Sequence, residues 1–317
     1  MTARRWATAL LTALLLLAAA TRSTDAQPDL RVRSASGEWR SWWRADRAPT
    51  RWPAADATLA ATVRWRSAAP GLDVAELTLS TPGEGGVRAL GRIAVVLVRL
   101  DPSRHSLRLD ATPSADGVSW STSDAAASVR LALNAGQFTD TGPWGWVVHR
   151  GREMQAPAAG PLSAALVVAA DGSARLVDAT GLDSARALTG PQAAVEAVQS
   201  YPALLRGDGE VPTPLRAPGR GIDVEHRDAR LAVGELRDGR LLFALTRFDG
   251  LGAVASRVPL GLTVPETAAL LGALGARRAM LLDGGLSAQL LVREAGGVTR
   301  EWKGMRRVPL GLVASAR

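Results

Sequence analysis

The sequence contains no cysteine, only one lysine (Lys303), and no apolar run beyond its first 20 residues that is long enough to cross a membrane. The missing thiols exclude disulfide frameworks, thiolate metal sites, cysteine nucleophiles and lipid anchors attached to cysteine. The formal net charge is +8, but the arginines that supply it are scattered among acidic residues rather than gathered in a run. Charge therefore does not indicate a nucleic-acid partner.

The first segment has the features of a secretory signal. Arg4 and Arg5 precede an apolar stretch over residues 6–20, and small residues then offer cleavage after Ala20 or Ala26. A spanning helix needs about 20 apolar residues, so this stretch is short for a retained anchor, which is the alternative interpretation. We expect residues 1–26 to be a signal peptide and the mature chain to be exported, periplasmic or secreted, with no membrane span.

Residues 27–69 form an arm rich in tryptophan and arginine. The tryptophans of this arm are Trp39, Trp42, Trp43, Trp52 and Trp65. Exposed indole rings stack well on sugars. The other interpretation, an arm whose rings cover an open edge of the main domain, is favoured because tryptophan is usually largely buried.

Residues 70–317 alternate short apolar strands with turns. The predicted strands are 93–100, 129–133, 144–149, 164–169, 241–246 and 279–282. One helix is predicted, because Thr263-Val-Pro-Glu266 is a capping box and Gly275 supplies a stop. Residues 182–188 are too short and too closely flanked by glycine to favour a helix. The predicted fold class is α+β, with strand-rich mixed sheets, few helices and a single main domain.

Several catalytic motifs are missing. The sequence has no Walker loop, no G-x-S-x-G elbow and no H-x-x-x-H pair. Gly250–Ala255 resembles a dinucleotide loop, but Pro259 follows too soon for the required helix, so a turn is predicted. We predict no cofactor and no metal.

Four polar, glycine-containing segments stand at predicted strand ends, and each alone is ordinary turn chemistry. With a further strand and turn (WGWVVHRGREM, 144–154), they are LALNAGQF (131–138), VQSYPALLRGDG (198–209), RLAVG (230–234) with Asp238-Gly239, and the helix–strand–DGGLS stretch of 262–292. In this order the chain resembles the phosphodiester glycosidase family over about residues 70–316.

The resemblance implies hydrolysis of a sugar-1-phosphodiester at the anomeric carbon, with a carbohydrate or glycosyl-phosphate substrate. Asp283 is the predicted nucleophile or base, with a plain Asp-Gly turn as the alternative. Arg230 is predicted to bind phosphate, or else to form a salt bridge with Asp228 or Glu235. Asp249 is the second carboxylate candidate, and an Asp-Gly turn is again its alternative.

The resemblance also implies a set of substrate-binding residues, for which turn formation or core packing is the alternative role. These are Asn134, Gly136, Trp144, Gln199, Ser200, Gly284, Gly285 and Ser287. Family glycine or phenylalanine is replaced at Ala135, Gln137 and Leu286. Asp228 stands where many members have histidine, and His226 lies close by. A non-catalytic carbohydrate-binding or exopolysaccharide-assembly protein on the same fold is therefore the alternative function.

Overall fold

The structure is a computed structural model. It describes residues 29–81, 91–111, 120–217, 219–249 and 260–317. The predicted signal peptide and the predicted turn at 250–255 lie outside these ranges. No helix within them is long and apolar enough to cross a membrane.

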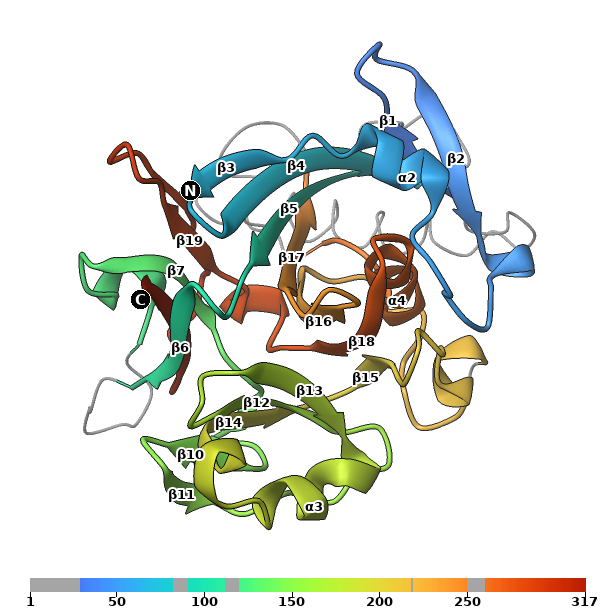
Figure 1. Ribbon diagram of the computed structural model, residues 1–317. Coiled ribbons are helices and arrows are strands. Elements are labelled where there is room, and N and C mark those ends of the chain that lie inside the picture. The colour runs from blue at the N-terminus through green and yellow to red at the C-terminus, as the bar shows by residue number, and fades with distance from the viewer. Residues whose placement is uncertain (1–28, 82–90, 112–119, 218, 250–259) are drawn as a thin grey trace, which may run out of the picture.

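The largest sheet runs through the middle of the molecule (Figure 1) and has nine strands. They are β1 (Asp29–Arg33), β2 (Trp39–Arg44), β3 (Arg66–Ala69), β4 (Leu72–Ser80), β5 (Arg92–Leu100), β15 (Ala203–Leu205), β16 (Arg230–Leu236), β17 (Leu241–Phe248) and β18 (Ala276–Leu281). Their order is β15-β18-β16-β17-β5-β4-β1-β2, and β3 pairs with β4. Along β5, Val96 and Val98 enter one core whereas Val95 and Leu97 enter another, so this continuous apolar strand is buried on both faces.

Two five-stranded sheets and one short hairpin complete the strands. One sheet contains β10 (Val147–His149), β11 (Arg152–Gln155), β12 (Ala164–Ala169), β13 (Ala174–Asp178) and β14 (Ala194–Ser200); the other contains β6 (His105–Asp110), β7 (Val129–Asn134), β19 (Leu290–Arg293), β20 (Thr299–Trp302) and β21 (Gly311–Ala316); the hairpin is β8 (Phe138–Thr139) and β9 (Gly142–Pro143). Every pairing between these described strands is antiparallel, which refines the prediction of mixed sheets. The strand-rich α+β class and the single domain are confirmed.

The six predicted strands correspond to β5, β7, β10, β12, β17 and β18. The third is shorter than predicted and begins at Val147. Gly145, with φ of +80°, turns the chain just before it. A Cβ at Gly145 would lie 2.5 Å from the side-chain oxygen of Gln199, so only glycine permits this approach.

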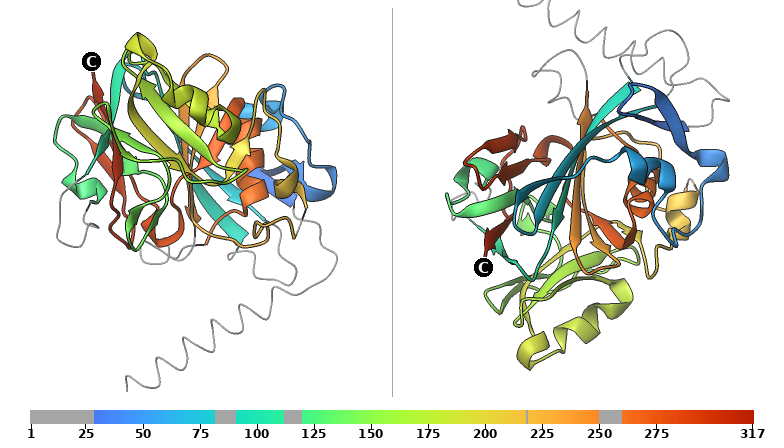
Figure 2. Two further views of the ribbon diagram at one scale, coloured as in Figure 1. Left: turned by 90° about the horizontal axis from the view of Figure 1, so that it is seen from below. Right: turned by 45° about the horizontal axis from the view of Figure 1, so that its top comes forward.

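The predicted helix is α4 (Val264–Ala273). Thr263 and Glu266 exchange the side-chain to backbone hydrogen bonds of a capping box, and Gly275 follows with φ of +93°. The helix is buried on nearly all sides rather than along one stripe, because the large sheet and the N-terminal segment enclose it (Figure 2). Two shorter helices, α2 (Ala57–Thr62) and α3 (Leu182–Arg186), are also present. The expectation of no helix at residues 182–188 is thus wrong over the single turn of α3.

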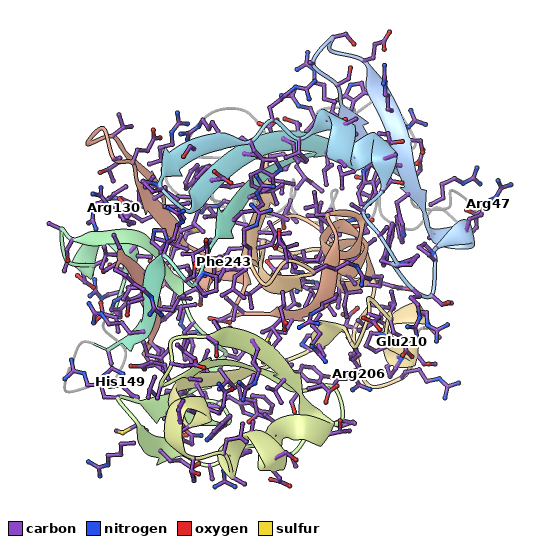
Figure 3. The ribbon with its side chains drawn as sticks, in the orientation of Figure 1. Arg47, Arg130, His149, Arg206, Glu210 and Phe243 are labelled. Atoms are coloured by element: carbon purple, nitrogen blue, oxygen red, sulfur yellow. The ribbon has the colours of Figure 1, made fainter. Side chains whose placement is uncertain are left out.

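The N-terminal strands belong to the large sheet, and two of the N-terminal tryptophans are buried beside it. β1 and β3 both pair with β4, and Trp43 and Trp52 are buried in the core around α4. A Cβ on Gly272 of α4 would lie 2.3 Å from the Trp52 ring, so the indole rests directly on the helix backbone. Trp39 is exposed. The opposite face of the sheet meets the two smaller sheets around Phe243, which Figure 3 places in the interior.

Candidate active site

Several of the candidate functional residues lie at one end of the strands of the large sheet. β18 ends there and β16 begins there, because the two strands are antiparallel neighbours with Ala232 opposite Leu281. Beyond the strands the backbones stay together, since the N–H of Gly285 donates to the oxygen of Ala229 over 2.8 Å. Asp283 and Asp228, which flank these two strands, are thereby brought to the same place.

Asp283 has the environment of a reactive carboxylate. It lines a pocket of about 470 Å³, and its Oδ2 has no hydrogen-bond partner among the described residues. Burial raises the pKa of Asp283, and the negative charge of Asp228 raises it further. A hydrogen bond from the Ser287 hydroxyl and the positive charge of Arg306 oppose this rise in pKa without cancelling it.

Asp228 lies on the other side of the glycine turn. A Cβ on Gly285 would lie 3.0 Å from its Oδ2, and the N–H of Ala229 donates to its Oδ1 over 2.8 Å. Burial raises the pKa of Asp228, while the charges of Arg230 and His226 oppose the rise. Where many family members have histidine, this chain has a second, partly buried carboxyl, whose charge raises the pKa of Asp283. Two such groups titrate as a pair, so one of them retains a proton more readily.

Aromatic rings line the same pocket as the carboxylate. Trp144 and Tyr201 meet edge to face, with ring centroids 6.4 Å apart. The side-chain amide of Gln137 donates to the oxygen of Tyr201 over 2.7 Å and so links two segments that line the pocket. Phe138, Thr139, Ala159 and Gly160 complete the lining. A half-buried indole above an open cavity suits the apolar face of a pyranose.

Two predicted binding residues are fully buried, and their side chains are engaged with backbone. Asn134 donates to the oxygen of Asp283 over 2.6 Å and accepts from the N–H of Gln289 over 3.0 Å. Gln199 accepts from the N–H groups of Trp146 and Ala158. The structure therefore places both residues behind the pocket, where they hold its walls in position.

The small residues of the predicted set also shape the turns. A Cβ at Gly136 would lie 2.5 Å from the oxygen of Gln199, and one at Gly284 would lie 2.7 Å from the oxygen of Ala229. The N–H of Gly284 points to the carboxylate of Asp283 itself. With the N–H of Gly285 also engaged, these two glycines allow close packing rather than offer free N–H groups to a ligand.

Ser200 and Ser287 are both buried beside the site. The Ser287 hydroxyl forms the hydrogen bond to Asp283 described above. The Ser200 hydroxyl has no hydrogen-bond partner within the described part of the chain. A buried hydroxyl without a hydrogen-bond partner costs folding free energy, so we keep Ser200 among the candidate site residues.

Arg230 is committed to the protein backbone. Its guanidinium donates to the oxygen of Leu262 over 3.0 Å and to that of His226 over 2.7 Å. Burial lowers the pKa of Arg230, and the charge of Asp228 partly restores it. Glu235, its other suggested partner, instead pairs with Arg277. The side chain thus braces the loop that carries Asp228.

Asp249 lies at the same edge of the sheet but is paired. Its carboxylate accepts from the guanidinium of Arg92 over 3.0 and 3.2 Å. The pocket beside Asp283 is not lined by Asp249. The structure therefore brings Asp228, and not Asp249, together with Asp283.

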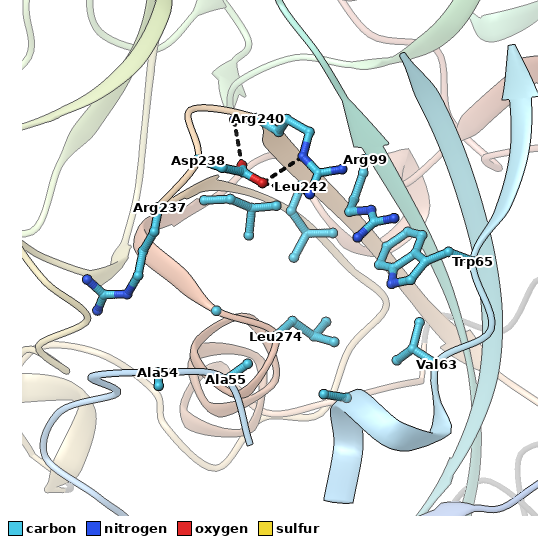
Figure 4. Close-up of a pocket in the computed structure, with 13 residues that line it drawn as sticks. Ala54, Ala55, Val63, Trp65, Arg99, Arg237, Asp238, Arg240, Leu242 and Leu274 are labelled. Atoms are coloured by element: carbon cyan, nitrogen blue, oxygen red, sulfur yellow. Dashed lines mark hydrogen bonds and ion pairs between the residues drawn. The ribbon is translucent and has the colours of Figure 1, made fainter. Parts of the chain in front are cut away.

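A second pocket, of about 400 Å³, lies at the opposite end of β16 (Figure 4). Arg99 stacks on the ring of Trp65 with its guanidinium carbon 3.9 Å from the centroid, and it forms an ion pair with Asp73 at 2.9 Å. Arg240 pairs with Asp238 at 2.6 Å. Every charged group named here already has a partner.

Within the described ranges, no group of three or more His, Asp or Glu side chains is placed to hold a metal ion.

Three residues at the site are not among the predicted catalytic or substrate-binding residues: Asp228, Tyr201 and Arg306. Tyr201 lies inside the segment that the family resemblance selects, next to Ser200. Asp228 stands out there only as a departure. Arg306 lies in a loop without any motif and is identified by its position over the Phe138 ring, 4.7 Å from the centroid.

Comparisons with known proteins bear on the family and the fold. The family model described as phosphodiester glycosidase matches residues 127–315. No curated protein sequence matches the chain. The catalytic domain of zebrafish N-acetylglucosamine-1-phosphodiester alpha-N-acetylglucosaminidase, auto-inhibited by its pro-peptide, is 18% identical, with a TM-score of 0.60 over 82% of this chain and 91% of that one. A hypothetical protein from Synechocystis is 15% identical, with a TM-score of 0.51 over 93% of this chain and 69% of that one. At such identities these two structures show the fold.

Proposed function

The chain belongs to the phosphodiester glycosidase family, and we propose that it hydrolyses the anomeric bond of a sugar-1-phosphodiester. The substrate class is an N-acetylglucosamine-type or related envelope glycan. The observation that carries this proposal is the carboxyl of Asp283, which lines a cavity together with Trp144 and Tyr201 and has one buried oxygen without a described partner.

We assign Asp283 the role of general base. A raised pKa brings the carboxyl closer to neutral pH, where a base transfers protons most effectively. In its ionised form, the carboxylate accepts a proton from water while the water oxygen forms a bond to the anomeric carbon. The bond from that carbon to the phosphate oxygen breaks, and the electron pair leaves with the phosphate monoester. This leaving group is already stable as an anion, so little acid assistance is required.

The experiment is a substrate panel with purified residues 27–317. A methyl diester of N-acetylglucosamine 1-phosphate, diesters of other sugars and matched aryl glycosides are offered, and the first sugar product is observed by NMR. A base acting on water predicts release of sugar from at least one diester with inversion at the anomeric carbon. Release with retention would instead make Asp283 a nucleophile.

One observation favours the alternative of carbohydrate binding without cleavage. Leu286, in the turn between Asp283 and Ser287, replaces a family glycine and leaves 47% of its surface exposed beside the site. Binding of the panel without any turnover would replace our proposal with this one.

We also propose that the protein acts after export, in the periplasm or outside the cell. Support comes from Arg4, Arg5 and the apolar stretch behind them. Protein recovered from fractionated cells is expected to begin at Thr21 or Gln27. Recovery of the chain with an intact N-terminus from the cytoplasm would contradict export.

A further inference from the structure

The proposed reaction needs a cation that Asp283 does not supply. Among the described residues, those that line its pocket include no arginine or lysine, so a phosphate diester entering the pocket would meet the carboxylate with no cation in that lining. Arg230, the residue expected to bind phosphate, donates to the oxygens of Leu262 and His226. Within the described part of the chain, a cation for the phosphate is therefore to be sought at the rim of the pocket.

The loop that follows β20 carries three basic side chains, and one of them, Arg306, contacts the rim residue Phe138. Lys303 pairs with Glu301 at 3.6 Å, and Arg307 pairs with Asp124 at 2.6 Å. Arg306 differs, because its exposed guanidinium has no carboxylate within 4.0 Å among the described residues. It is the basic group of this loop that a ligand can recruit without breaking an existing ion pair.

Arg306 is also held in place. Its guanidinium carbon lies 4.7 Å from the centroid of the Phe138 ring, which lines the pocket. A cation over the face of a ring is oriented by it and keeps its N–H donors for other partners. The backbone N–H of Arg306 donates to the oxygen of Leu286 over 3.0 Å, so the loop is tied to the turn that begins at Asp283.

We propose that Arg306 binds the phosphate of the substrate at the Phe138 rim of the pocket, and that Arg230 is a positioning residue. This inference rests on the proposed function, because it assigns the phosphate contact of that reaction. The planar guanidinium can offer two parallel N–H donors to the two unesterified phosphate oxygens, with the sugar then directed towards Asp283 and the aromatic wall. Selection of a phosphodiester over an ordinary glycoside would thus reside in one side chain.

The test compares R306Q with R307Q, a neighbouring arginine that is already paired with Asp124. Both variants are assayed on a sugar-1-phosphodiester and on an aryl glycoside of the same sugar. We expect R306Q to lower kcat/KM for the diester by about 10- to 150-fold, the range for hydrogen bonds to a charged group. The aryl glycoside should be nearly unaffected, and R307Q should resemble the wild type on both substrates.

R306K should restore part of the diester activity, because it returns the charge without the planar fork. Equal losses of R306Q on both substrates, or none on the diester, would overturn the phosphate assignment while leaving the proposed hydrolysis intact.

If the wild type cleaves neither substrate, the proposed function fails, and calorimetry decides the role of Arg306. Wild-type protein should then bind N-acetylglucosamine 1-phosphate more tightly than N-acetylglucosamine, and R306Q should abolish the difference. The same preference in R306Q, or no binding of the sugar phosphate by the wild type, would overturn the inference.

Discussion

The two ends of β16 carry pockets of similar volume but opposite electrostatic character. Around Trp65 the cations are matched by carboxylates, with Arg99 on Asp73 and Arg240 on Asp238. Around Asp283 one carboxylate oxygen lacks a partner among the described residues, and the carboxyl is buried beside a second one. Paired charges stabilise the structure in which they are found, whereas unpaired ones carry a cost that a ligand can relieve. The charge balance, rather than the cavity volume, distinguishes the candidate active site.

The largest expected effect comes from replacing one carboxylate at each end. D283N should lower kcat/KM for a sugar-1-phosphodiester by about 10²- to 10⁴-fold, because the base is lost. D238N, at the other pocket, should leave turnover unchanged. Sugar release is measured for both, with thermal melting to verify folding. Full activity of D283N would remove its assigned role, and inactivity of a folded D238N would contradict the functional contrast between the two ends.

The glycine turns offer a second contrast. Gly285 and Gly239 have φ of +59° and +84°, so alanine at either should cost about 1–2 kcal/mol of unfolding free energy. Only at Gly285 would the new Cβ also press on a carboxylate, at 3.0 Å from Oδ2 of Asp228. We expect G285A to lose activity about 10- to 100-fold as the carboxyls shift, and G239A to lose stability alone. Equal activities of the two variants in enzyme assays would show that the position of Asp228 is unimportant.

The pH dependence of stability should have opposite signs at the two ends. The pKa of Asp283 is raised in the folded state, so its contribution to stability is present below the unfolded pKa and is lost as pH rises through the folded pKa. D283N removes that loss, and its unfolding free energy relative to the wild type should increase from pH 4 to pH 8 by about 1.4 kcal/mol for each unit of pKa difference.

At Asp238, burial is outweighed by hydrogen bonds from Arg240, which lower the pKa. Its contribution is therefore present above the unfolded pKa and is lost as pH falls through the folded one. D238N should lose stability at neutral pH, by a small amount because half of the side chain is exposed. Denaturant unfolding at several pH values measures both variants. Parallel pH curves for the two would refute the opposite signs.

The smallest effect is expected from R240Q. Its ion pair with Asp238 is partly exposed, so the loss of unfolding free energy should be about 1 kcal/mol or less. Activity should not change, because the residue lies at the far end of β16. A clear loss of diester cleavage in R240Q would bring the second pocket into the substrate site.

Local sequence patterns predicted those features of the fold, such as helix ends and apolar strands, that neighbouring residues determine. The capping box of Thr263 and Glu266 begins α4 where expected, and continuous apolar runs become β5 and β17 because both faces of the large sheet are covered. The all-round burial of α4 was not predictable from its own residues. It depends on Trp52, more than 200 positions away, lying on the helix.

The candidate site likewise combines features that the local sequence predicts with features that depend on distant contacts. Asp283 follows from a strand that ends in a glycine turn, which the sequence displays directly. The engagement of Asn134 with Gln289, and of Asp249 with Arg92, depends on partners about 155 positions distant in each case. Contacts between residues so far apart in the sequence cannot be predicted from the spacing of motifs. Arg306 lies over Phe138 at the rim of the pocket, in a loop whose backbone is tied to Leu286, so the three-dimensional structure was needed to find it.

The pairing of β4 with two N-terminal strands has a practical consequence for protein production. β3 covers the beginning of β4, opposite residues 72–74, and β1 covers its end at Leu79 and Ser80. A chain shortened to begin at residue 70 would expose the backbone N–H and C=O groups of this nine-residue, largely apolar strand. Such a strand accepts another copy of the chain as readily as its own partner. Truncation at the apparent start of the family resemblance should therefore yield self-associating material, whereas a chain that begins at residue 27 keeps β4 covered.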